Sequence, residues 1–186
     1  LTSSSTPSQV LRSVLTFDTQ VISDISSSLD PDAFEAAVFA LLDARRVALL
    51  AFGFSYFVCL DAQDRLSSIG MDVRAPESPN MKLMLTNRLQ PEDVAICVSH
   101  TGATKEVLRY AELAQRQGAT TIALTSFARS KLAKIADITL VAGGREIDFR
   151  FDAASARLAQ LAVLDAIYLA LALNLGEKAE TSLAVY

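Results

Sequence analysis

The fold of this 186-residue chain is decided by residues 93–118, which read DVAICVSHTGATKEVLRYAELAQRQG. Residues 93–98, at the start of this stretch, form an almost unbroken apolar run, as expected of a strand that is covered on both faces of a parallel sheet. A hydroxyl-rich loop follows at 99–104, and apolar residues at helical spacing then predict a helix over 105–117 that ends at Gly118. A strand, a loop and a helix in this order form the repeating unit of an α/β fold.

The same alternation of apolar runs and helical patterns continues on both sides of this stretch. Two helices are expected near the start, because apolar residues recur by threes and fours over residues 10–25 and Asp30-Pro31 is a typical helix start. We therefore predict a three-layer αβα sandwich around a five-stranded parallel sheet of the flavodoxin-like, doubly wound type. The expected strands are 46–52, 71–73, 93–98, 120–125 and 137–141, and the expected later helices are 56–69, 105–117, 131–135 and 153–175.

A single domain is expected over residues 9–177, with a polar, Ser-rich linker at 1–8 and a tail at 178–186. The linker lacks the basic start and the apolar core of a signal peptide. The longest apolar segment, residues 158–175, contains Gln160 and Asp165, and an aspartate at the centre of a membrane is unfavourable. We therefore expect a buried helix there, no membrane association and a cytoplasmic location.

Composition argues against several classes of function. Hydrophobic residues make up 51% and charged residues 20% of the chain, and its net charge of −4 with no basic run makes direct DNA binding unfavourable. Cys59 and Cys97 each lie in an apolar stretch and are expected to be buried free thiols. With one histidine and no CxxC pair, the chain offers few ligands for zinc, so we predict no metal site.

The strongest candidate site is the loop after the third expected strand, Ser99-His100-Thr101-Gly102-Ala103-Thr104. At the start of a helix, backbone N–H groups and the positive end of the helix dipole favour a phosphate. The glycine lets the backbone approach the anion, and the hydroxyls supply further hydrogen bonds. Helix capping by Ser or Thr is the alternative interpretation, but three hydroxyls around a glycine favour a ligand.

A second loop, Ala51-Phe52-Gly53-Phe54-Ser55, follows the first expected strand. On its own it is compatible with any tight turn, because glycine is common in turns of every kind. The chain contains neither GxGxxG nor GxxxxGK[ST], so neither a dinucleotide nor an ATP held in a P-loop is expected. We therefore predict no cofactor.

Together, the two loops resemble the signature of the SIS (sugar isomerase) domain family: a GxGxS-like turn, then S-x-S/T-G-x-T, then a strand that ends in Thr. In this chain these parts are Gly53-Phe54-Ser55, residues 99–104 and Thr125. The resemblance covers about residues 8–176, and within the family the chain is most similar to the effector domain of RpiR-type transcriptional regulators. The turn departs from the pattern, since Ala51 stands where the family often has glycine and two phenylalanines make the turn bulkier.

This resemblance implies a phosphorylated sugar as the ligand, with hydroxyl contacts to the phosphate. It also implies a homodimer or higher homo-oligomer with the long C-terminal helix in the interface, and contact with DNA only through an N-terminal helix-turn-helix domain that this chain lacks. The residues expected to contact the phosphate are Ser55, Ser99, Thr101 and Thr104, and the remaining members of the expected ligand-binding set are Gly53, His100, Gly102 and Thr125.

Whether the chain senses the sugar or converts it depends on a catalytic base, because aldose–ketose isomerisation moves a proton between neighbouring carbons. His100 is expected to turn its side chain away from the anion, with a ligand contact as the alternative. Glu146 is a weak candidate for a catalytic acid, and a solvated loop acid is equally consistent with its position. We therefore predict a sugar-phosphate-binding effector domain. A phosphosugar isomerase, or an interaction module with Phe52 and Phe54 filling its pocket, are the alternatives.

Overall fold

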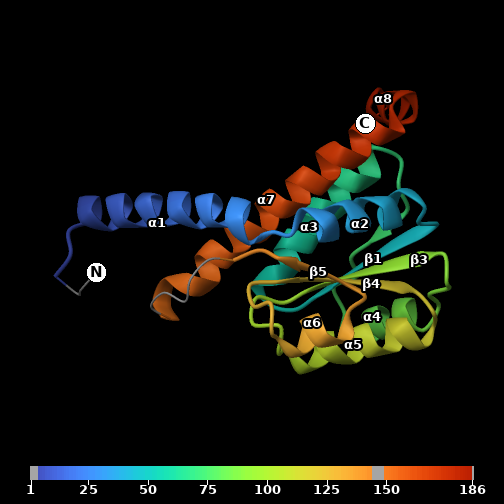
Figure 1. Ribbon diagram of the computed structural model, residues 1–186, viewed down its shortest axis with the longest axis horizontal. Helices are drawn as coiled ribbons and strands as arrows, with labels where there is room; N and C mark the ends of the chain where they lie inside the picture. Colours follow the sequence, from blue (N-terminus) through green and yellow to red (C-terminus); the bar gives the residue numbers. More distant parts are fainter. Residues whose placement is uncertain (1–3, 144–148, 186) are drawn as a thin grey trace.

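The computed structural model describes residues 4–143 and 149–185, and its centre is a five-stranded parallel sheet with the strand order β2-β1-β3-β4-β5. The predicted three-layer αβα sandwich is confirmed (Figure 1). The central strand β3 is buried along its entire length, which explains its nearly continuous apolar sequence. The strands are β1 (Arg46–Ala51), β2 (Val73–Arg74), β3 (Asp93–Val98), β4 (Thr120–Thr125) and β5 (Ile138–Val141).

Alternate residues of each strand contribute to two separate cores, one on each face of the sheet. In β1, Val47 and Leu49 face the first core, whereas Ala48 and Leu50 face the second. The first core is covered by α1 (Pro7–Ser28), α2 (Pro31–Leu42), α3 (Phe54–Ser68) and α7 (Phe149–Leu175). The second core is covered by α4 (Pro79–Thr86), α5 (Lys105–Arg116) and α6 (Lys131–Ile135).

The strand order places the topological switch point between β1 and β3. α3 follows β1 onto one face of the sheet, whereas α5 follows β3 onto the opposite face. The amino-terminal ends of these two helices therefore begin at neighbouring strand ends and diverge. In doubly wound sheets, ligands bind at such a point. Both loops identified from the sequence, 51–55 and 99–104, lie there.

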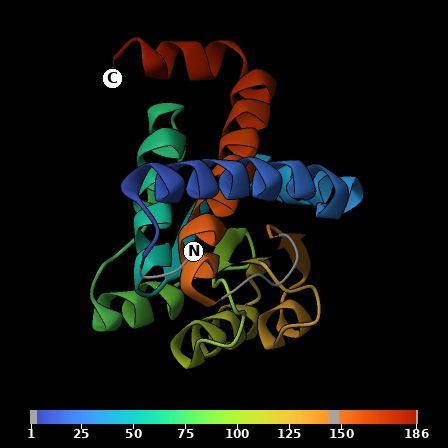
Figure 2. The same ribbon diagram turned by 90° about the vertical axis from the view of Figure 1, so that its left-hand side faces the viewer.

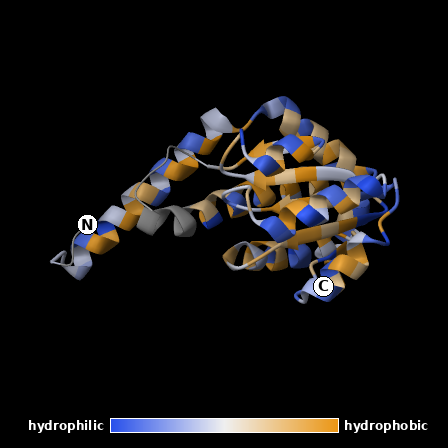
Figure 3. Ribbon diagram, turned by 90° about the horizontal axis from the view of Figure 1, so that it is seen from below, coloured by the Kyte–Doolittle hydropathy of each residue, from blue (hydrophilic) through white to orange (hydrophobic). Residues whose placement is uncertain are grey.

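α1 extends well beyond the sheet, as the view from below shows (Figure 3). Its second half contributes Val21 and Ile25 to the first core, while Leu11 and Leu15 in its first half lie exposed. A capping box formed by Thr6 and Gln9 starts the helix at Pro7, inside the segment predicted to be a linker.

α7 is the long apolar helix expected from the sequence, and over Ala156–Leu175 it is long and apolar enough to cross a membrane by length and composition alone. In this fold it packs against α1, α2 and α3 and buries Ile167 and Leu171. Its outer side leaves Leu169 58% and Leu173 82% exposed. The helix is therefore a core helix with an uncovered apolar outer side.

Two helices differ from the sequence-based expectation. α4 lies in a segment that carries no predicted element, and α8 (Glu177–Leu183) lies in the predicted tail and turns off the end of α7 (Figure 2). β2 begins two residues later and ends one residue later than expected, and it pairs with β1 at only two positions, Val47 with Val73 and Ala48 with Arg74. So short a strand carries too little periodicity for its ends to be located from sequence.

Candidate functional site

The hydroxyl-rich loop 99–104 lies at the carboxyl end of β3 and is held there by backbone hydrogen bonds. The Ser99 amide donates to Leu124 O at 3.0 Å, which extends the ladder to β4. The Gly102 amide donates to Ser99 O at 3.0 Å, and Gly102 O accepts from the Leu132 amide at 2.9 Å. The loop is thereby fixed on both sides, so its polar groups are preorganised.

Gly102 is required at the centre of this loop for two reasons. Its φ of +58° lies in the left-handed region, which residues with a side chain adopt at a cost. A Cβ at this position would also overlap the side chain of Ser130 and lie 2.9 Å from Thr125 Oγ1. The glycine therefore allows the β3 loop to press against the β4–α6 connection.

The predicted ligand-binding hydroxyls at the ends of β3 and β4 have three different arrangements. Ser99 Oγ and Thr104 Oγ1 lie 2.9 Å apart and form a hydrogen-bonded pair across the loop. Thr101 is exposed, and its Oγ1 accepts a hydrogen bond from the Ala103 amide at 3.3 Å. Thr125 is fully buried and donates to His100 O at 3.1 Å, so it supports the loop from behind.

The amino-terminal ends of α3 and α5 differ from those of most other helices in their capping. In four other helices the N-cap side chain accepts a hydrogen bond from a backbone N–H of the first turn. These N-cap residues are Thr6 of α1, Asp30 of α2, Ser78 of α4 and Ser130 of α6. Within the described chain, Thr104 makes no such bond to α5, and the N-cap of α3 is Gly53, which has no side chain to do so. Among the described residues, neither first turn has a side-chain acceptor, and both turns begin at the switch point. Ser55 lies in the first turn of α3.

This observation weighs against the capping interpretation of the loop. If Thr104 were present to cap α5, its hydroxyl would accept from the helix rather than pair with Ser99. The N–H groups of two helix ends and two paired hydroxyls meet at adjacent strand ends instead. Such an arrangement can bind an anion through hydrogen bonds and the dipoles of both helices.

His100 turns its ring toward the end of β4. Nδ1 lies 2.8 Å from Ser126 Oγ, and the ring centroid lies 5.5 Å from that of Phe127. The Ser126 hydroxyl donates its proton to Ala142 O at 2.9 Å, so the proton shared with His100 must come from Nδ1. In the neutral ring, Nε2 is then the acceptor nitrogen.

The two phenylalanines of the first loop lie in different surroundings. Phe54 is 72% exposed at the start of α3, so it does not fill a closed pocket. Phe52 stacks on Tyr110, with ring centroids 6.0 Å apart and planes 10° from parallel. The interpretation of a pocket filled by both side chains is therefore not supported.

Sequence reasoning missed Lys82, which lies beside this loop. Its Nζ lies 4.6 Å from the Phe52 ring and 4.7 Å from the Tyr56 ring, and donates to Glu77 O at 2.7 Å. Lys82 is 2% exposed, and burial lowers the pKa of its ammonium group despite the opposing charge of Glu77. The lysine lies on α4, and without that helix nothing in the sequence related it to the first loop.

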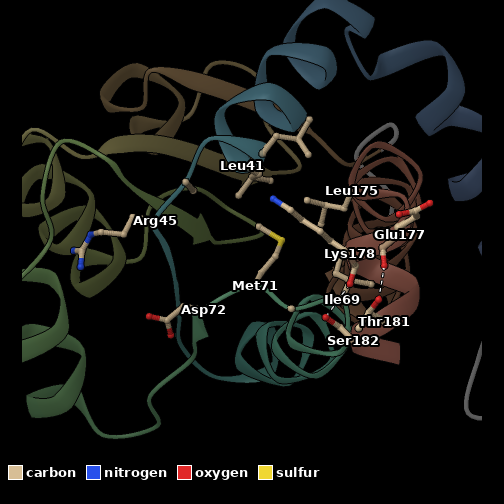
Figure 4. A pocket seen from close by; sticks show the side chains of 13 residues that line it. Leu41, Arg45, Ile69, Met71, Asp72, Leu175, Glu177, Lys178, Thr181 and Ser182 are labelled. Carbon is tan, nitrogen blue, oxygen red and sulfur yellow. Dashed lines mark hydrogen bonds between the residues drawn. The ribbon is translucent and has the colours of Figure 1, made fainter. Parts of the chain in front are cut away.

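Glu146, the weak catalytic candidate, lies outside the described residues. Two of the cavities in the described part of the chain stand out, and neither of these two is lined by any of the eight predicted ligand-binding residues. The larger of the two, about 700 Å³, lies beside the amino-terminal ends of β1 and β2, with Arg45 and Asp72 among its lining residues (Figure 4). Its floor is apolar, with Leu41 and Leu175 among its residues, and Lys178 and Glu177 of α8 lie at its side.

Among the described residues, no three His, Cys, Asp or Glu side chains are grouped to hold a metal ion.

Comparison with known proteins agrees with this geometry. A family model described as the SIS domain matches residues 40–170. The chain belongs to the SIS domain family. An HTH-type transcriptional regulator from Caldanaerobacter subterraneus subsp. tengcongensis is 33% identical to this SIS domain over 163 residues, which cover 88% of the chain and 58% of the regulator. The chain spans between 51% and 58% of the length of the curated relatives it matches.

Solved structures show the same SIS fold. The sugar isomerase domain of an RpiR transcription factor from Sphaerobacter thermophilus superimposes with a TM-score of 0.84 at 27% identity, covering 95% of this chain and 97% of that one. The NanR protein of Vibrio vulnificus, complexed with ManNAc-6P, superimposes with a TM-score of 0.86 at 22% identity, covering 94% and 66%. At 22% identity, the similarity to NanR shows a shared fold and nothing about the ligand of this chain.

Proposed function

We propose that this SIS domain is the phosphosugar-binding effector domain of a cytoplasmic, homodimeric RpiR-type transcriptional regulator. DNA would be bound by a helix-turn-helix domain in the part of the regulator that this chain does not span. The observation that carries the proposal is the pair of first turns, in α3 and α5, that lack a side-chain cap and begin at adjacent strand ends.

A phosphate dianion matches this site chemically. Amide donors from the two first turns and the hydroxyls of Ser55, Ser99, Thr101 and Thr104 would surround it. Each hydrogen bond to a charged group contributes about 1.5–3 kcal/mol, and each helix end adds about 0.3–1 kcal/mol. Several such contacts together are enough for the micromolar affinity typical of a metabolite sensor, after the cost of association is subtracted.

Relatives support both halves of the proposal. A NanR protein with the same fold binds ManNAc-6P, and a curated relative at 33% identity is an HTH-type transcriptional regulator. The uncovered side of α7, with Leu169 and Leu173, supplies an apolar surface for a second copy of the chain. A ligand bound near such an interface would shift the relative positions of the two subunits, provided that it binds one arrangement more tightly.

Isothermal titration with a panel of hexose and amino-sugar phosphates tests the proposal. Ser55→Ala and Ser99→Ala should each weaken binding about tenfold or more, since each removes one hydrogen bond to a charged group. Ser68→Ala is the matched control, because Ser68 lies at the opposite end of α3 and its hydroxyl donates to Arg65 O. Equal affinities for all three variants would contradict the phosphate site. Turnover of an aldose phosphate by the wild type would favour the isomerase instead.

A further inference from the structure

The smaller cavity, about 410 Å³, lies between α4 and the edge of the sheet formed by β2, away from the hydroxyl-rich loop. Arg46 begins β1, and two residues later Ala48 pairs with Arg74 of β2 and faces the second core. Because alternate residues of a strand share a face, the side chains of Arg46 and Arg74 lie on the face that α4 covers. Arg88, two residues after the end of α4, completes the rim.

The charge of this cavity is strongly one-sided. Of the nine described residues that line it, three are arginines and none is acidic. Asp72 lies nearby and binds Arg46 Nε at 2.8 Å and Arg74 Nε at 2.9 Å, so one carboxylate serves two guanidinium groups. Arg88 forms no ion pair with any described residue. The cavity therefore holds an excess of two positive charges in a chain whose net charge is −4.

The opposite wall of the cavity is apolar and adaptable. Met81 and Met84, on neighbouring turns of α4, are 53% and 48% exposed, and Leu85 lies beside them. Unbranched methionine side chains adjust their shape to a bound group, and they are common at binding surfaces. The volume lies in the range of about 300–1,000 Å³ that is usual for small-molecule sites.

We propose that this cavity binds a small organic anion: a carboxylate or phosphate monoester that carries an aromatic or acyl group. Arginines bind carboxylate and phosphate oxygens in a bidentate manner, and the apolar group would lie on Met81 and Met84. The ligand class differs from a phosphosugar, whose hydroxyls find few partners on the methionine wall. The site is separate from the hydroxyl-rich loop, so the proposal does not depend on the proposed function.

The three methionines of the chain provide a direct measurement of binding. Met81 and Met84 line this cavity, whereas Met71 lines the larger one and serves as an internal control. In the full chain labelled with methyl-¹³C methionine, NMR titration with phenyl phosphate or 4-phenylbutyrate should shift the Met81 and Met84 signals and leave Met71 unchanged. Inorganic phosphate and 4-phenylbutanol, which each carry half of the ligand, should bind at least about tenfold more weakly.

Variants separate a specific site from general charge attraction. Arg88→Gln should weaken phenyl phosphate binding about tenfold, as expected for the loss of one charge-assisted contact. Asp72→Asn should strengthen it, because both guanidinium groups lose their competing carboxylate. Arg12→Gln, on the exposed part of α1, removes the same charge far from the cavity and should have no effect.

Several outcomes would overturn the proposal. These are shifts at Met71 alone, equal binding of the neutral alcohol, no saturation by either anion at millimolar concentration, or unchanged binding in Asp72→Asn. Saturation only by an acidic peptide would also overturn it, since the site would then be a protein-binding surface. None of these outcomes bears on phosphosugar binding at Ser99.

Discussion

Replacement of Gly102 by alanine tests the geometry of the hydroxyl-rich loop most directly. The φ of +58° costs a residue with a side chain about 1–2 kcal/mol. The new Cβ would also overlap Ser130 and approach Thr125 Oγ1 to 2.9 Å, and overpacking of this kind costs about 1–3 kcal/mol. We therefore expect the free energy of unfolding to fall by about 2–5 kcal/mol.

Two further variants separate backbone strain from overlap. Gly118→Ala lies at the other end of α5, with a φ of +82° and Pro91 Cγ as its nearest neighbour at 3.3 Å, so it should lose only about 1–2 kcal/mol. Ser130→Gly removes the overlapping side chain and, although Ser130 caps α6, should itself cost only about a few tenths of a kcal/mol. In the Gly102→Ala background, Ser130→Gly should restore about 1 kcal/mol or more instead of adding to the loss.

Urea unfolding of the wild type, the three single variants and the double variant, followed by circular dichroism, measures these differences by linear extrapolation. The prediction is wrong if the loss of unfolding free energy in Gly102→Ala is within about 0.5 kcal/mol of the loss in Gly118→Ala. It also fails if the double variant shows simple additivity, because the overlap with Ser130 would then have no energetic consequence.

Three further predictions concern groups outside the site. Thr121→Val should lower the free energy of unfolding by about 1–3 kcal/mol in urea titrations, because the buried Thr121 hydroxyl donates to Asp137 Oδ2 at 2.7 Å. Cys59 and Cys97 are buried, and burial raises the pKa of the Cys97 thiol to about 12, so Ellman's reagent should detect two thiols only after unfolding in guanidinium. Burial alone would raise the pKa of Asp72, but the two arginines that bind it lower that pKa overall. The wild type should therefore be more stable than Asp72→Asn, with the whole difference present above the unfolded pKa of about 3.9. The difference should disappear as the pH falls through the lower pKa of the folded state.

Most of the fold could be predicted because its strands are either buried on both faces or followed by clear helix starts. β3, α5 and β4 match their expected positions within one residue, since an apolar run of six residues next to an amphipathic helix has few other interpretations. α4 was missed although Ser78 and Pro79 form a standard helix start. Its eight residues are too few to establish a period, and its buried lysine interrupts the apolar pattern.

The site was predictable only in part. The positions of Ser99, Gly102 and Thr104 follow from a loop between a strand and a helix, and the structure brings Ser99 and Thr104 together as a pair. The supporting contacts did not follow, because they join segments far apart in the sequence. These contacts are the close approach of Gly102 to the Ser130 side chain, the bond from His100 to Ser126 and the position of Lys82 beside two aromatic rings.

The capping pattern of the described helices favours the interpretation of the hydroxyl-rich loop as a binding site. Four helices satisfy their first turns with a side chain, so suitable capping residues are common in this sequence. At α5 a threonine occupies the N-cap position, yet its hydroxyl pairs with Ser99 and leaves the helix end without a side-chain acceptor. Among the described helix starts, α3, α5 and the short α8, whose N-cap is Gly176, lack a side-chain acceptor. Of these three, α3 and α5 flank the switch point, where a bound anion would supply the missing acceptors for both at once.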